Sequence, residues 1–257
     1  MKKVLSSLLF TIFLCIFLYS GYRLYLIFSE YRRGTRTYQE TAARHVSQVD
    51  LPPRETDEKK TGDPLVLPDP CPIRVDFDAL KAENPDIRGW LYMADSVISY
   101  PVLQGETNDT YLRHLPSGEY NTAGSLFIDS ACQGDMTDLT TVIYGHNMHN
   151  GSMFAVLESY KKQDFYDAHP LMWYLTPKGA YRLNILAGLV VSADHPLYSL
   201  YESEEDLESF LDYALSGSDF RSRYGQKHPE RLFILSTCDY SYDDARYILV
   251  AEPVPAD

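Results

Sequence analysis

The sequence lacks the features that mark nucleic-acid-binding and metal-binding proteins. Its 257 residues carry a formal net charge of −13, whereas nucleic acids select basic surfaces, so we expect no nucleic-acid partner. No group of cysteines and histidines has the spacing of zinc ligands, because the close pair His146 and His149 has no thiol nearby. No calcium-binding motif and no internal repeat is present either. We therefore expect no metal and no cofactor.

Long hydrophobic runs are scarce as well, and the only one covers residues 4–28. Arg23 alone interrupts it, near its far end, where a long side chain can reach the interface. The length fits one bilayer-spanning helix, and a cleaved signal peptide would have a shorter apolar region and a small-x-small cleavage site. Residues 1–28 therefore predict a short N-terminal stub, which Lys2 and Lys3 favour on the cytoplasmic side, and a transmembrane anchor, with the remainder on one side of the membrane. Basic residues flank both ends of the run, so they do not decide its orientation: Lys2 and Lys3 before it, Arg32, Arg33 and Arg36 after it.

The rest of the chain divides by composition. Residues 29–72 are polar, and their second half is rich in proline, which predicts a membrane-proximal stalk with a helical start over 31–49 and a flexible remainder. The globular domain is expected over residues 73–257. The apolar fraction of 45% and the charged fraction of 23% are ordinary for a chain with a packed core.

Short β-type runs dominate the globular part. Strands are expected near residues 89–92, 97–103, 125–128, 140–144, 181–191, 231–238 and 246–250. Helices are expected over 76–83, 152–160 and 203–214, the last capped by Ser203. Many short strands with few helices suggest a mainly β fold, a closed barrel that carries added helices.

Three reactive side chains stand at the ends of predicted strands. Cys238 ends one strand, Arg246 begins the next, and His146 follows the run 140–144 and a glycine. A thiolate is the nucleophilic form of cysteine and a nearby cation favours it. Histidine can act as a base, and arginine can hold a substrate oxygen or stabilise charge that develops on it. Together the three predict a cysteine-dependent catalytic site.

Each of these residues also has an ordinary explanation when taken alone. Cys238 can be a small buried hydrophobe, His146 a loop histidine, and Arg246 the partner of Asp243 or Asp244 in a surface salt bridge. The combination at three strand ends is what favours catalysis. Cys15 is expected to be inert in the span. Two alternatives stay open for Cys71 and Cys132, which lie in predicted loops: they are either free or joined by a disulfide.

Other cysteine chemistries fit poorly. A Cys-x5-Arg phosphatase wraps an anion in a loop of backbone amides, but here seven residues without glycine separate Cys238 from Arg246. Asp239, Asp243 and Asp244 in that loop would repel phosphate. A papain-like protease has its cysteine before its histidine, and neither its signature nor that of caspases is present.

Several motifs resemble those of the sortases, the membrane-anchored transpeptidases of Gram-positive cell surfaces. Tyr144-Gly-His146-Asn-Met, Leu235-Ser-Thr-Cys238 and Arg246-Tyr-Ile-Leu-Val are similar to their histidine, cysteine and arginine motifs. The resemblance runs from about Phe77 to the end of the sequence. Class B in particular is indicated by the helix at 203–214 and by three further motifs: Asn84-Pro-Asp-Ile-Arg-Gly-Trp-Leu91, Tyr100-Pro-Val-Leu-Gln104 and the Gly-x-Met-Phe154 that follows the histidine motif.

This resemblance implies an eight-stranded β-barrel, a single N-terminal anchor and an extracellular catalytic domain. It implies catalysis by Cys238, His146 and Arg246, a cleft floor formed by Ser236 and Thr237, and peptide contacts by two further residues, Asn108 and Leu112. The enzyme would cleave the C-terminal sorting signal of surface proteins after a threonine, in an Asn-Pro-x-Thr-like or Ser-Pro-x-Thr-like sequence. A thioacyl intermediate would then pass the protein to an amine of a peptidoglycan precursor.

Three other functions remain alternatives. Class C pilin sortases carry an Asp-Pro-aromatic lid and often a second span; here Cys71 follows Asp69-Pro70 and no second span is expected, which favours class B but leaves pilin polymerisation open. A cysteine endopeptidase that only hydrolyses would share every catalytic residue. The third alternative is a wall-binding module with a structural Cys238. In the enzyme, we expect only a minor fraction of thiolate–imidazolium pair at neutral pH, with Asn147 and Asn150 as candidates to orient His146.

Overall fold

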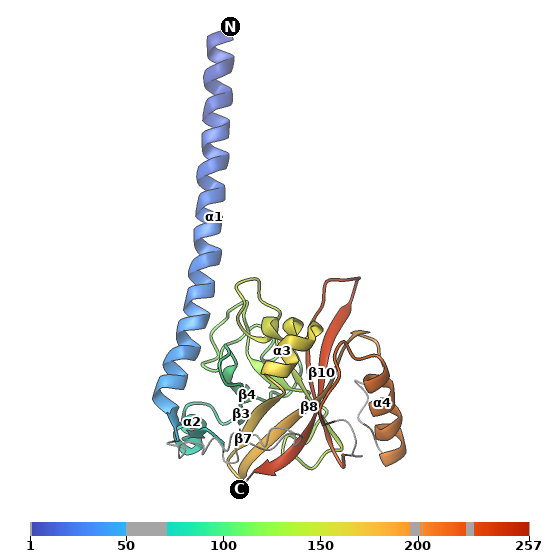
Figure 1. The fold of residues 1–257 in the computed structure, drawn as a ribbon. Coiled ribbons are helices and arrows are strands. Elements are labelled where there is room, and N and C mark those ends of the chain that lie inside the picture. Colours follow the sequence, from blue (N-terminus) through green and yellow to red (C-terminus); the bar gives the residue numbers. More distant parts are fainter. Residues whose placement is uncertain (1, 50–70, 196–200, 202, 225–228, 257) are drawn as a thin grey trace, which may run out of the picture.

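The molecule is a β-barrel beside a long N-terminal helix (Figure 1). The computed structural model describes residues 2–49, 71–195, 201, 203–224 and 229–256. Most of the predicted flexible part of the stalk, residues 50–70, lies outside the described residues. The division of the chain at residues 28 and 72 therefore stays a proposal.

Eight strands form the barrel and close it on itself. They are β3 (Ile87–Tyr92), β4 (Ser99–Leu103), β5 (Leu126–Ile128), β6 (Thr140–Tyr144), β7 (Leu171–Thr176), β8 (Gly179–Ser192), β9 (Leu232–Cys238) and β10 (Ala245–Ala256). Their order around the barrel is β10-β8-β7-β3-β4-β5-β6-β9. The β4–β5 and β6–β9 pairs are parallel and the other strand pairs are antiparallel. The predicted mainly β fold with a closed eight-stranded barrel is confirmed.

In the described part of the chain, four helical segments lie on the outside of the barrel: α2 (Phe77–Glu83), the 3-10 helix η1 (Phe154–Lys161), α3 (Gln163–Ala168) and α4 (Glu204–Ser216). The Ser203 hydroxyl accepts a hydrogen bond from the Asp206 amide at 3.2 Å, so the predicted cap of α4 is present. The buried face of α4 packs beside β8, β9 and β10 in one hydrophobic cluster. Strand β7 and helix α3 were not expected from the sequence.

Helix α1 (Lys2–His45) runs through the predicted boundary between anchor and stalk without a break. Among the described residues it is the helix that is long and apolar enough to cross a membrane, and its most apolar stretch is not buried. Its last turns pack against the barrel, where Tyr38 is buried and contacts Tyr100 edge to face. After α1 the short strand β1 (Val46–Gln48) pairs with β2 (Ile73–Val75). The helical start of the stalk is therefore part of the packed structure.

Cys71 and Cys132 are both buried free thiols. They belong to different hydrophobic clusters, Cys71 with the residues around α2 and Cys132 with the barrel interior. Burial raises the pKa of each thiol to about 11. The disulfide that the sequence left open is absent here, because the fold places each thiol in its own apolar environment.

Candidate active site

A pocket of about 210 Å³ opens where β6, β9 and β10 meet at one end of the barrel. All seven residues singled out from the sequence line it: Asn108, Leu112, His146, Ser236, Thr237, Cys238 and Arg246. Four further residues complete the lining: Asp109, Phe127, Tyr144 and Gly145. Among the described residues, no group of three or more His, Cys, Asp and Glu side chains could hold a metal ion.

The register of β9 and β10 brings the thiol and the guanidinium together. Cys238 and Arg246 are directly opposite each other in this antiparallel pair. Because opposite residues of an antiparallel pair project their side chains to the same face, both reach the same pocket. Both side chains are half-buried. The guanidinium of Arg246 donates to the carbonyl of Ala245 at 3.0 Å, and within the described part of the chain it forms no ion pair with Asp243 or Asp244.

The parallel pairing of β6 with β9 brings the histidine to the same end. Tyr144 pairs with Ser236, so the residues that follow β6 lie next to the end of β9. The hydroxyl of Thr237 donates to the carbonyl of Gly145 at 2.8 Å and ties the two chain segments together. A Cβ at Gly145 would lie 2.4 Å from Leu126 Cδ2. A side chain at this position would have to displace the buried side chains of Leu126 and Phe154, so glycine fits best before His146.

A main-chain carbonyl orients the imidazole. Nε2 of His146 lies 2.7 Å from the carbonyl oxygen of Leu112. Since a carbonyl only accepts hydrogen bonds, Nε2 carries the hydrogen and Nδ1 is the basic nitrogen of the neutral ring. Burial lowers the pKa of His146, and the charge of Arg113 lowers it further, although the bond to Leu112 acts in the opposite direction. The neutral imidazole is therefore favoured near neutral pH.

Known proteins resemble the chain over this whole region. Sortase B of Staphylococcus aureus is 32% identical over 183 residues, which cover 70% of this chain and 75% of the relative. Sortase B of Listeria monocytogenes is 36% identical over 172 residues, or 66% of this chain and 70% of the relative. A solved Staphylococcus aureus sortase B–substrate complex superposes with a TM-score of 0.65 at 31% identity, over 70% of this chain and 85% of that one. The chain belongs to the sortase B family. No family model matches it.

The sortase B assignment makes the chain a sortase transpeptidase, and the structure shows how its thiol-bearing strand end is held. The side-chain amide of Asn147 donates to the carbonyl of Cys238 at 2.9 Å and to Glu158 Oε1 at 2.8 Å. Asn147 directly follows His146 in the sequence, so this hydrogen bond links the histidine loop to the backbone of Cys238. Among the described residues, the partner of the Asn150 side chain is Ser152, whose amide and hydroxyl donate to it within its own turn. Neither asparagine was found to orient His146, because the Leu112 carbonyl does so.

A buried carboxylate beneath the pocket was missed by sequence reasoning. Asp129 accepts a hydrogen bond from the Tyr144 hydroxyl at 2.8 Å and one from the Asn108 amide at 3.2 Å. The amide oxygen of Asn108 accepts from the backbone of Ser130 at 2.8 Å. Asn108 is therefore locked in orientation, in the same run of turns as Leu112. Asp129 follows β5 with no motif of its own, so the sequence had no signal that could reveal it.

The acidic loop beside the cysteine is partly neutralised. Asp239 is buried and accepts hydrogen bonds from the Lys161 ammonium and from Ser241. Burial alone would raise the pKa of Asp239, but the bonds from Lys161 and Ser241 outweigh it and lower the pKa below its ordinary value. Asp239 is the carboxylate nearest to Cys238 in the sequence, and its negative charge is balanced by the ammonium of Lys161 at the end of η1.

Proposed function

We propose that this sortase B family member is a membrane-anchored cysteine transpeptidase that joins sorting-signal-bearing surface proteins to an amine of the cell wall precursor. The observation that carries the proposal is the pairing of Cys238 with Arg246 across β9 and β10 in the pocket that His146 also lines. A nucleophile, a proton carrier and a fixed cation are the groups that acyl transfer through a thioester requires. The solved complex of Staphylococcus aureus sortase B with its substrate is consistent with a peptide substrate.

In the first step the Cys238 thiolate attacks the carbonyl carbon of the threonine in the sorting signal. A carbon–sulfur bond forms, and the carbon–nitrogen bond to the downstream peptide breaks. The imidazolium of His146 gives its proton to the departing amine. Arg246 stabilises the negative charge that develops on the carbonyl oxygen, because a guanidinium keeps its charge and presents donors in a fixed plane.

In the second step the acceptor amine attacks the thioester. Neutral His146 takes the proton from the amine, an amide bond forms, and the Cys238 thiolate leaves. The bond to the Leu112 carbonyl supports this role, since it keeps the ring in one orientation while Nδ1 exchanges protons. Turnover then returns the enzyme to its starting state without a cofactor.

The remaining lining residues are assigned to the peptide. Ser236 and Thr237 form the floor of the cleft, and Thr237 is fixed by its bond to Gly145. Asn108 and Leu112 contact the peptide at the opposite wall. Helix α1 is assigned as the single membrane span, with the catalytic domain extracellular.

The test separates transfer from hydrolysis. The enzyme is mixed with an Asn-Pro-x-Thr-containing peptide, with and without a glycine oligomer or a diaminopimelate-type peptide, and the products are identified by mass spectrometry. We expect a ligated product that depends on Cys238. Free acid as the sole product at saturating amine would instead identify an endopeptidase, and ligation only to the lysine of a pilin-like protein would identify a pilin-polymerising enzyme.

A further inference from the structure

The order of contacts along α1 relates the barrel to the membrane. Glu30 lies at the end of the apolar stretch, and its backbone carbonyl accepts from the Asn121 side chain at 3.1 Å while its carboxylate accepts from the Thr122 amide at 2.8 Å. Tyr38 donates from its hydroxyl to the carbonyl of Gly124. Further on, Arg44 pairs with Glu83 of α2 at 2.7 Å. These contacts fix one side of the barrel along the helix axis.

The helix direction then determines which end of the barrel is nearest the bilayer. From residue 28 to residue 44 the helix advances by roughly 24 Å at about 1.5 Å per residue, so α2 lies well away from the apolar stretch. In Figure 1 the N-terminal part of α1 rises past the end of the barrel where β10 begins, and the other end of β10 lies beside the C-terminus below. The end that carries Cys238 and Arg246 is therefore the end that points along α1 toward its apolar part.

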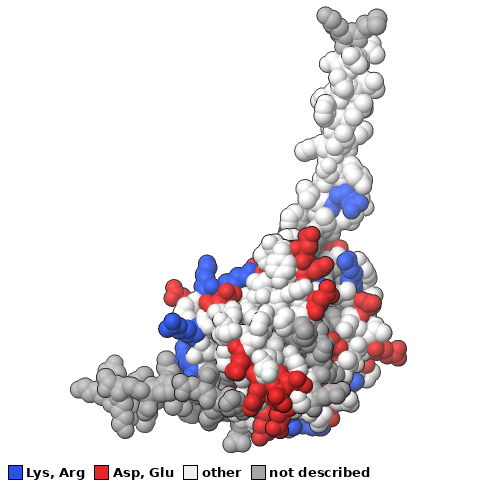
Figure 2. Space-filling view, turned by 90° about the vertical axis from the view of Figure 1, so that its right-hand side faces the viewer, with Lys and Arg blue, Asp and Glu red and all other residues white. Residues whose placement is uncertain are grey.

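A pocket confirms that the active-site end is level with the last turns of the apolar stretch. It has a volume of about 530 Å³, and Leu24, Ile27 and Phe28 line it together with His149 and Asn150. His149 and Asn150 belong to the loop that follows His146. Figure 2 shows that the protruding part of α1 carries almost no charged side chains, whereas charged side chains are spread over the barrel below.

The loop between β9 and β10 presents exposed aromatic rings at this same end. Tyr240 is 67% exposed and Tyr242 is 50% exposed. The Tyr240 ring stacks on His149 with ring centroids 6.2 Å apart. The β9–β10 loop therefore contacts the loop after His146, which itself lies beside the apolar part of α1. Tyrosine side chains concentrate at the membrane–water interface, where the ring lies among headgroups and the hydroxyl stays hydrated.

We infer that the catalytic end of the barrel faces the membrane, with Tyr240 and Tyr242 in the lipid headgroup layer. This inference rests on the proposed assignment of α1 as a membrane span. Exposed groups of both signs lie at this end, Asp243 and Asp244 in the loop and Arg32 and Arg36 beside His149, so a zwitterionic lipid without net charge is the suitable surface for the test. The pocket of Cys238 would then open at the membrane surface and take substrates and acceptors that are held there.

The full chain in phosphatidylcholine vesicles tests this orientation. Trp90 and Trp173 are buried, so a tryptophan placed in the loop supplies a distinct signal. We expect a nitroxide on the lipid headgroup to quench the added tryptophan fluorescence of the Tyr240→Trp and Tyr242→Trp variants several-fold more than that of Lys178→Trp. Lys178 is the matched control, because it is exposed in the β7–β8 turn at the other end of the barrel.

Two controls keep the outcome decisive. Flotation of the vesicles reports anchoring by itself: a chain that fails to float contradicts the proposed span, whereas a floating chain with equal quenching at residues 240 and 178 overturns the orientation.

Tyr38→Ala removes the bonds to Gly124 and Ser125 and the contact with Tyr100. Combined with Tyr240→Trp, it should still float but lose most of the extra quenching; unchanged quenching would show that docking of α1 does not set the orientation.

Discussion

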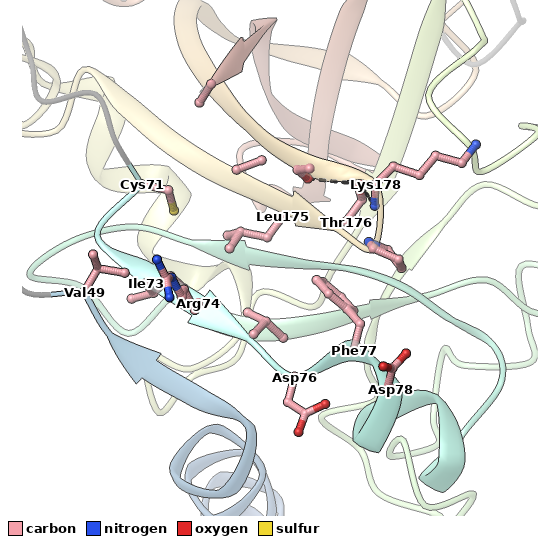
Figure 3. A pocket seen from close by; sticks show the side chains of 15 residues that line it. Val49, Cys71, Ile73, Arg74, Asp76, Phe77, Asp78, Leu175, Thr176 and Lys178 are labelled. Atoms are coloured by element: carbon pink, nitrogen blue, oxygen red, sulfur yellow. Dashed lines mark hydrogen bonds between the residues drawn. The ribbon is translucent and has the colours of Figure 1, made fainter.

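Two pockets of this molecule each contain a cysteine and an arginine, and only one of them has the other groups that acyl transfer needs. The larger, about 710 Å³, lies between β2, α2 and the β7–β8 turn, and Figure 3 shows Cys71 and Arg74 among its lining residues. The smaller, about 210 Å³, contains Cys238 and Arg246. The larger pocket has no histidine among its described lining residues, and its thiol is buried with a raised pKa.

Strand register, and not pocket volume, distinguishes the two cysteines. Cys238 lies between two strands whose ends place Arg246 on one side and the residues after β6 on the other. Cys71 precedes the short edge strand β2, where burial favours the protonated thiol. A thiol becomes a candidate nucleophile when a proton carrier and a cation share its pocket, and a large cavity does not supply them.

The largest expected effect comes from exchanging each cysteine for alanine. Cys238→Ala should abolish cleavage of a sorting-signal peptide, a loss of roughly four orders of magnitude or more, because no other group can form the thioester. Cys71→Ala should keep full turnover and lower the free energy of unfolding by about 1 kcal/mol. Turnover and denaturant unfolding of both variants check this. Substantial turnover by Cys238→Ala would erase the distinction between the two pockets.

The two arginines give the next largest contrast. Arg246→Ala should lower kcat by about 10²- to 10³-fold, the cost of losing a group that stabilises an oxyanion. Arg74→Ala should leave the kinetics unchanged, since Arg74 lines the other pocket. Steady-state kinetics with one peptide measure both. An equal, mild effect of the two substitutions would mean that Arg246 serves stability rather than the reaction.

A smaller effect on kcat is expected from Asn147, which holds the end of β9 that carries Cys238. Asn147→Ala removes the donor to the Cys238 carbonyl and to Glu158, and the resulting shift of the thiol should cost about 10- to 100-fold in kcat. Asn150→Ala, three residues on, breaks bonds only to Ser152 and is the matched control. We expect the kcat of Asn147→Ala to fall with little change in KM. A change confined to KM would place Asn147 in substrate binding.

The smallest effect concerns the protonation of His146, the group that the larger pocket lacks. Arg113 is exposed and its charge lowers the pKa of His146. Arg113→Gln should therefore raise this pKa, so the imidazolium persists to higher pH and the limb of the pH–rate profile that reports its loss moves upward. Added salt should shrink the difference between the variants, because exposed charges are screened. A downward shift, or one insensitive to salt, would contradict the assigned cause.

Much of this site could be predicted because its residues end or begin continuous apolar strands. The runs before Cys238 and His146 and after Arg246 are strongly β-type, and the cap at Ser203 marks α4. Main-chain chemistry could not be predicted: the Leu112 carbonyl that orients His146 belongs to a turn without a sequence signal.

The docked part of α1 was also hidden from sequence reasoning. Residues 30–45 are mostly polar and show no apolar stripe that would announce a packed helix. Their packing depends on single contacts, such as the buried hydroxyl of Tyr38 and the close approach of Gly34 to Asn121. Contacts of this kind depend on the folded partner surface, so they become visible only in the structure.

Trapping of the acyl-enzyme identifies the residue that forms the thioester. The full chain is mixed with a sorting-signal peptide without amine, quenched in acid and analysed by intact and peptide-level mass spectrometry. Our account predicts one added acyl group, located on Cys238, retained by Cys71→Ala and Cys132→Ala and absent from Cys238→Ala. Peptide cleavage with no adduct, or an adduct on any other residue, would contradict it.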